Sequence, residues 1–221
     1  MSLDADALTR LPSPARLEAF SDGVLAIAIT LLILEVRIPD YPPGGLGSAL
    51  LEQWPSYATY VLTFAVIGVM WVNHHGLFRV IVRVNRPIMY LNLAILMGIA
   101  FLPFPTSLFS HALQTTDRAD QKTAAFVYSL NLVLISLTWL TTWLYLSRRT
   151  ELLDGFDRED ARQATRRVAV GPAIYITCAL VALVSPYLCL VGHGVVAVYF
   201  IVSGERGRAP IRPTEPLDRS T

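Results

Sequence analysis

The apolar residues of this chain are gathered into runs long enough to cross a lipid bilayer, and this constrains its fold more than any other feature. A membrane-spanning helix needs about 20 mostly apolar residues in succession. We identify six such segments, at residues 17–36, 57–78, 87–110, 122–146, 168–186 and 188–203. Only 16% of the 221 residues are charged, against about 25% in soluble domains. The sequence therefore predicts an all-α, polytopic membrane protein with six transmembrane helices, surrounded by the bilayer.

The regions between and beyond these segments have distinct compositions. Residues 38–53 contain three Pro and three Gly, a cluster that breaks helices, and we expect an extramembrane loop there. Residues 148–167 are highly charged but compatible with a helix. Residues 1–16 form the expected N-terminal segment, residues 17–203 the transmembrane domain, and residues 204–221 a tail that we expect to be disordered, because it lacks any apolar pattern.

The fifth and sixth segments leave an alternative open. Both are shorter than the others, and Ser185 and Pro186 join them with almost no linker. Either a tight turn connects two full spans, or the two segments form a broken, re-entrant pair that does not cross the bilayer.

The distribution of basic residues predicts the orientation. With six spans and the N-terminus inside, only Arg37, Arg118 and Lys122 of the 18 Lys and Arg residues lie on the outer side. Cytoplasmic loops carry the excess of basic residues in membrane proteins, so we expect both termini in the cytoplasm. Because Lys122 is the single lysine beside 17 arginines, the composition is typical of a GC-rich genome and favours a bacterial cell membrane.

Several function classes find no support in the sequence. A net charge of +1 provides no general attraction for polyanions, so a nucleic-acid partner is not expected. Neither a phosphate-binding loop, a nucleophile elbow nor a zinc-protease motif is present; we therefore predict no enzyme, no catalytic residue and no cofactor. Cys178 and Cys189 both lie in apolar runs and are interpreted as small buried apolar residues. His111 and His193 are interpreted as loop or interface residues.

The first segment carries an apolar stripe. At 100° per residue, Ile27, Leu31 and Leu34 fall within about 60° of one another, and the hydroxyl of Thr30 lies beside them. Asp22 lies about 140° from Ile27, on a different face. A stripe of this kind is by itself most often a packing or lipid-facing surface.

Polar residues within the first two segments form a second pattern. Ser21 and Asp22 lie near the start of the first segment, and Asn73, His74 and His75 lie in the second, with Asn92 in the third. Polar groups in a membrane need hydrogen-bond partners, so we expect these helices to be joined by a polar cluster in which Asp22 or Arg16 pairs with the histidines. The alternative is that Ser21 or Asp22 caps the start of the helix. Since adjacent His side chains diverge by about 100°, a metal site is not expected.

These residues resemble the signature of the transmembrane protein 175 family of potassium channels, found in prokaryotes and in animal endolysosomes. The similarity consists of Arg16, three residues and then Phe20-Ser21-Asp22-Gly23, followed in the second segment by Trp71, two residues and His74-His75. The six-segment layout extends it to nearly the whole chain, although the later segments carry no motif that we can match. Like that family, the chain lacks the Thr-Val-Gly-Tyr-Gly filter of other potassium channels.

The resemblance implies a role for the apolar stripe. In that family, four copies of the first helix line the pore, so Ile27 matches the constriction, Thr30 the hydroxyl layer associated with selectivity, and Leu31 and Leu34 further apolar rings. Animal members with two six-helix repeats form dimers, which implies a homotetramer for a chain with one repeat. Potassium is then the permeant ion, conducted passively and with modest selectivity.

Two other functions remain as alternatives. Asp22, His74 and His75 could relay protons in a proton-coupled secondary transporter, although only Ser185-Pro186 suggests the broken helices typical of such proteins. The chain could also be a membrane scaffold that does not conduct, in which the polar cluster only determines how the helices pack.

Overall fold

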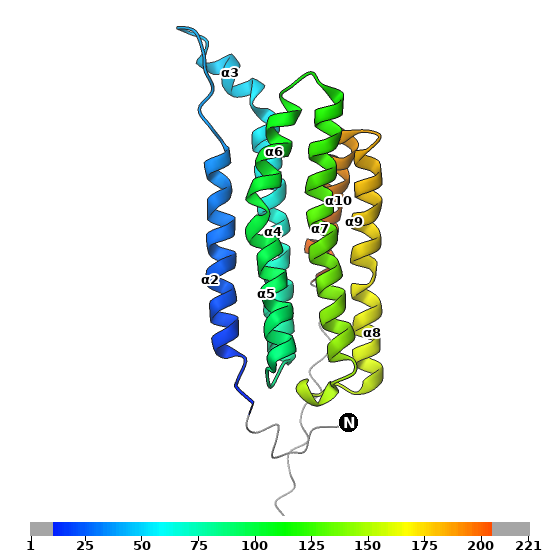
Figure 1. Cartoon of the computed structure of the whole chain (residues 1–221). Helices are drawn as coiled ribbons and strands as arrows, with labels where there is room; N and C mark the ends of the chain where they lie inside the picture. The colour runs from blue at the N-terminus through cyan, green and yellow to red at the C-terminus, as the bar shows by residue number, and fades with distance from the viewer. Residues whose placement is uncertain (1–10, 205–221) are drawn as a thin grey trace, which may run out of the picture.

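The computed structural model describes residues 11–204, which form a bundle of helices running up and down beside one another (Figure 1). Within that range there is no strand, and one isolated bridge pairs Ile81 with Leu153. The elements are α2 (Ala15–Leu31), η1 (Leu32–Glu35), α3 (Leu46–Glu52), α4 (Trp54–Val80), α5 (Arg86–Phe101), α6 (Pro103–Leu113), α7 (Arg118–Leu146), η2 (Thr150–Leu152), α8 (Arg158–Val168), α9 (Val170–Ala182) and α10 (Pro186–Gly204). The tail after residue 204, for which we expected disorder, lies outside the described residues. So do its basic residues, Arg206, Arg208, Arg212 and Arg219.

Four stretches of helix are long and apolar enough to cross a membrane: Ala15–Glu35, Trp54–Val80, Arg86–Leu113 and Arg118–Leu146. They correspond to the first four segments expected from the sequence, and they make the chain an integral membrane protein. The regions of the fifth and sixth segments contain α9, with 13 residues, and α10, whose apolar part is Pro186–Val202. Both helices run beside α7 in the bundle (Figure 1).

The third stretch is divided into two helices. α5 ends at Phe101 and α6 begins with Pro103 as its first residue. Proline has no N–H to donate and is tolerated in the first turn of a helix. The chain therefore begins a new helix at this point, while the Leu102 N–H still donates to the Ile99 carbonyl at 3.0 Å.

The linker at residues 38–53, expected to be an extramembrane loop, contains a short helix in its second half that the sequence did not predict. All of the Pro and Gly cluster except Gly47 lies before Leu46, and Gly44 adopts the left-handed φ of +83° that glycine permits. The following residues, Leu46–Glu52, form the short helix α3, because only Gly47 among them is a poor helix former.

The charged region at 148–167 is partly helical, as expected. α8 begins with a capping box, in which the Asp157 carboxylate accepts from the N–H groups of Glu159 and Asp160, and Asp160 accepts from the Asp157 N–H. Such a cap satisfies backbone donors that a helix start leaves free. The short bridge at Leu153 then attaches this region to the end of α4.

α2 lies at the edge of the bundle, where it packs against α4 and α5 (Figure 1). Only 22% of its apolar window is buried, against 50% for the window of α7. One side of the first membrane-spanning helix is therefore left without a neighbour in the single chain.

Candidate functional site

The membrane-spanning stretch formed by α2 and its continuation η1 has one buried side and one exposed side. Leu25 and Leu32 are 2% and 0% exposed and belong to the core of the bundle. Ile27, Leu31 and Leu34 are 61%, 42% and 67% exposed. The apolar stripe expected from the sequence thus faces away from the rest of its own chain.

Thr30 is also exposed and lies beside this stripe. Its hydroxyl shares its hydrogen between two carbonyl oxygens of the same helix, that of Ile27 at 2.9 Å and that of Ala26 at 3.0 Å. Because a hydroxyl has one hydrogen to donate, the lone pairs of Oγ1 stay free to accept or to coordinate.

The exposed side of α2 extends toward the N-terminal end of the helix. Phe20 lies two turns before Ile27 on the same face, with Gly23 between them and Arg16 one turn before Phe20; all three are exposed. Arg16 forms no hydrogen bond or ion pair with another described residue, so the structure does not bring it together with the histidines.

The buried polar residues of α2, α4 and α5 meet at one point. The Asn92 amide donates to Ser21 Oγ at 2.9 Å, and its Oδ1 lies 2.9 Å from His74 Nε2. Ser21 donates in turn to the Leu17 carbonyl at 2.8 Å. We call Ser21, His74 and Asn92 the polar triad; each is at most 3% exposed. Since Asn92 is the donor to Ser21, its oxygen accepts the Nε2 hydrogen of His74.

The remaining polar residues of the motif lie nearer the surface of the bundle. Asp22 accepts a hydrogen bond from Trp71 Nε1 at 3.0 Å, and His75 Nδ1 lies 3.1 Å from Glu18 Oε1. These two contacts join α2 to α4 beside the polar triad. Asn73 is exposed, and its side chain bonds to no residue in the described range.

Two alternatives can be judged from these contacts. α2 begins at Ala15 without a side-chain cap, so Ser21 and Asp22 lie well inside the helix and do not cap it. Asp22, His74 and His75, the residues of the alternative proton relay, do not hydrogen-bond to one another within residues 11–204; each binds a different partner. These are Trp71, Asn92 and Glu18.

Sequence reasoning misplaced His193, which is 1% exposed and packs in the core between the rings of Tyr128 and Tyr175. Its Nδ1 lies 2.8 Å from the Cys189 carbonyl oxygen four residues earlier. Gly192 and Gly194, which flank His193 in the sequence, both lie within α10. His111, by contrast, is exposed in the last turn of α6.

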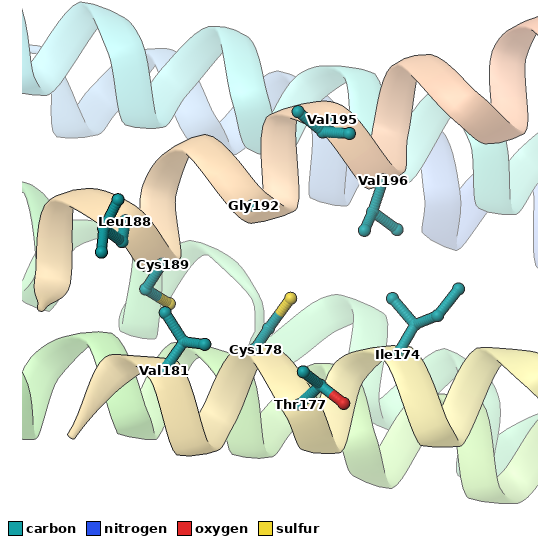
Figure 2. Close-up of a pocket in the computed structure, with 9 residues that line it drawn as sticks. All are labelled: Ile174, Thr177, Cys178, Val181, Leu188, Cys189, Gly192, Val195 and Val196. Carbon is teal, nitrogen blue, oxygen red and sulfur yellow. The ribbon is translucent and has the colours of Figure 1, made fainter. Parts of the chain in front are cut away.

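The two cysteines lie along the junction of α9 and α10, where a cavity of about 380 Å³ opens (Figure 2). Cys178 and Cys189 are free and buried, in agreement with the role expected for them. The cavity is lined almost entirely by apolar side chains. It therefore offers few groups that would coordinate an ion.

Known proteins are similar to this chain in the region that contains the stripe and the polar triad. The family model described as "Endosomal/lysosomal potassium channel TMEM175" matches residues 16–103, which include the stripe, the polar triad and both exposed contacts. A potassium channel of Streptomyces collinus is 48% identical over 187 residues, which cover 84% of this chain and 90% of that protein. A TMEM175 proton channel of Gallus gallus is 31% identical over 188 residues, covering 76% of this chain but 37% of that protein.

A solved structure extends the similarity to the fold. The crystal structure of a lysosomal potassium-selective channel TMEM175 homolog from Chamaesiphon minutus matches with a TM-score of 0.77 and 36% identity. The match covers 85% of this chain and 96% of that chain. It therefore includes the region of α7 to α10, for which the sequence offered no motif.

Proposed function

The chain belongs to the TMEM175 family of potassium channels, and we propose that it conducts potassium ions through a pore lined by α2. The observation that carries this proposal is the exposed stripe at Ile27, Leu31 and Leu34, on a helix whose polar residues are satisfied on its other sides. The stripe is left free to face other copies of itself, and Thr30 adds a hydroxyl to that face.

A pore lined by α2 requires several copies of the chain, since each copy contributes one such helix. We propose a homotetramer with cyclic symmetry. Identical head-to-tail contacts between neighbouring copies form a closed ring when the rotation from one copy to the next is a whole fraction of a turn. The chicken relative supports this reading. The aligned segment covers only 37% of that protein, which leaves room for a second copy of the unit in one chain.

Ile27 is the proposed constriction. Four isoleucine side chains around a narrow axis would expel water, and a hydrated ion cannot enter a dewetted passage. Opening then requires the α2 helices to rotate or move apart. Because apolar rings cannot replace the hydration shell of an ion, selectivity is modest, and the Thr30 hydroxyls supply the available coordination.

We propose six membrane spans with both termini in the cytoplasm of a bacterial cell. α9 and α10 supply the fifth and sixth spans. α9 is lengthened by the end of α8, since the single residue between them, Ala169, retains helical φ and ψ. α8 and the end of α4 then lie at the cytoplasmic end, in accord with their basic residues.

A planar-bilayer recording tests this function. With potassium on one side and sodium on the other, the purified protein is expected to give a current that reverses toward the potassium equilibrium potential. Ile27→Asn should raise the conductance, because an amide wets the constriction. Ile33→Asn is the matched control: Ile33 is 52% exposed but, in the 3-10 helix η1, lies about 120° around the axis from Leu34. Equal conductance of wild type and Ile27→Asn would contradict the proposed constriction.

A further inference from the structure

The cavity between α9 and α10 lies within the apolar parts of both helices. Its lining residues fall at positions 174–181 of α9 and 188–196 of α10, inside Val170–Ala182 and Pro186–Val202. In the proposed arrangement of six spans, this places the cavity at the depth of the lipid hydrocarbon. α9, which forms one of its walls, lies at the edge of the bundle opposite α2 (Figure 1).

The cavity has an exposed rim and a buried floor. Thr177, Leu188 and Val195 of the rim are exposed, whereas Cys178 and Cys189 below them are buried. Cys178 points from α9 toward α10 (Figure 2). From Leu188 to Val195 the cavity follows α10 for seven residues, or about 10 Å. One leaflet of a typical hydrocarbon core is about 15 Å thick, so the cavity has the length of most of one acyl chain.

A glycine keeps this space open on the α10 side. Gly192 lines the cavity, and a Cβ at that position would lie 3.7 Å from Cys178 Sγ. That distance is an ordinary van der Waals contact. A larger side chain at position 192 would therefore extend into the cavity instead of being excluded from the backbone.

Water is a poor occupant of this cavity. A bound water needs two to four polar partners, and the polar groups of the lining are already engaged. The Thr177 hydroxyl donates to the Ala173 carbonyl at 2.9 Å. The Cys189 thiol lies 3.3 Å from Ser129 Oγ and 3.4 Å from His193 Nδ1. Since apolar atoms in an empty space lose their dispersion contacts, an apolar occupant is favoured.

We propose that an acyl chain of a membrane phospholipid occupies this cavity, entering from the bilayer across the exposed rim. The choice of a lipid over a second copy of the chain rests on the proposed function, in which the copies meet through α2. Among the described residues, none that lines the cavity is charged. The site therefore selects the chain by shape, and phosphatidylcholine and phosphatidylglycerol should occupy it equally. The bound chain completes the packing between α9 and α10 at the level of Gly192.

Photolabelling of the purified full chain in phosphatidylcholine vesicles tests this site. Part of the lipid carries a diazirine midway along one acyl chain, and the labelled residues are identified by mass spectrometry of peptides. Leu180 is the reference for ordinary lipid contact, because it is 60% exposed on α9 and does not line the cavity. We expect the buried Cys178 to be labelled at least half as strongly as Leu180.

Two variants fill the cavity. Gly192→Leu should lower the labelling of Cys178 at least fivefold and leave that of Leu180 within twofold. Val196→Met lengthens a side chain that points toward α9 (Figure 2), and should lower the labelling of Cys178 at least threefold. Gly194→Leu is the matched control on the same helix, since nothing lies within 4 Å of a Cβ there; labelling of both residues should stay within twofold. Gel filtration shows which variants are folded.

Three results would overturn the proposal. Labelling of Leu180 without labelling of Cys178 would mean that acyl chains stay on the surface. Labelling of Cys178 that neither folded filling variant lowers would mean that lipid reaches it by another route. Labelling of Leu180 with none at Leu188 and Val195 would mean that a second copy covers the rim. Because no readout involves current, failure of this proposal is distinguishable from failure of the proposed pore.

Discussion

Replacing Asn92 with leucine is expected to destabilise the chain, because Asn92 is the central member of the polar triad. The side chains are similar in size, so the change removes hydrogen bonds with little change in volume. The His74 Nε2–H loses its acceptor at 2.9 Å, and Ser21 Oγ loses its donor at 2.9 Å. Ser21 keeps its own bond to the Leu17 carbonyl, so the unpaired group is the His74 ring.

The expected loss of unfolding free energy has two contributions. A hydrogen bond between membrane helices contributes about 0.6 kcal/mol on average, and two are lost. Leaving a buried donor without a partner costs about 1 to 3 kcal/mol. We therefore expect Asn92→Leu to lower the free energy of unfolding by about 2 to 4 kcal/mol. His74→Leu combined with Asn92→Leu should cost less than the two single changes together, since the unpaired donor is then removed.

Unfolding in mixed micelles, followed by circular dichroism as the denaturing detergent is increased, measures these differences. Asn73→Leu provides the control, because Asn73 is exposed on α4 and bonds to none of the described residues; its effect should stay within about 0.5 kcal/mol. An Asn92→Leu protein as stable as Asn73→Leu, or strictly additive effects at positions 74 and 92, would refute the role assigned to the triad.

Three further changes test other contacts. Gly98→Ala should lower the free energy of unfolding by about 1 to 3 kcal/mol, because the new Cβ would lie 2.5 Å from Ile135 Cγ1 where α5 packs against α7. Gly68→Ala is the control, since nothing lies within 4 Å of a Cβ at that position. Equal unfolding curves for the two variants would contradict the reasoning. Thr30→Val keeps the shape but removes the hydroxyl, and should lower the potassium-to-sodium permeability ratio without abolishing current; an unchanged reversal potential would exclude Thr30 from selectivity. Asp157→Ala removes the cap of α8 and should reduce thermal stability by about 1 kcal/mol, whereas an unaltered melting curve would show that the cap is dispensable.

The apolar pattern was sufficient to predict the first four spans and the stripe formed by Ile27, Leu31 and Leu34, whereas the expectation that this stripe faces a pore came from the family resemblance. Both follow from local properties, namely length, composition and a spacing of 3.6 residues per turn. The start of α3 and the break at Pro103 were not predicted. Each depends on where a helix resumes after a disruptive residue, and therefore on packing between segments far apart in the chain.

The polar partners were predicted only in part. The sequence identified Ser21, His74 and Asn92 as polar residues within apolar spans, but it favoured Asp22 or Arg16 as the partner of His74. The actual partner is Asn92, because the depth and rotation of α5 bring its amide between the other two. Similarly, His193 was misplaced because its environment is formed by Tyr128 and Tyr175 from other helices.

Block by silver ions tests most directly whether the exposed face of α2 lines the pore. In a background with Cys178 and Cys189 replaced by alanine, Ile27→Cys channels are recorded while Ag⁺, a thiol-reactive cation similar in size to K⁺, is added. We predict rapid, irreversible loss of current for Ile27→Cys and no change for Ile33→Cys. Persistent current through Ile27→Cys, or equal block at both positions, would contradict a pore lined by this face of α2.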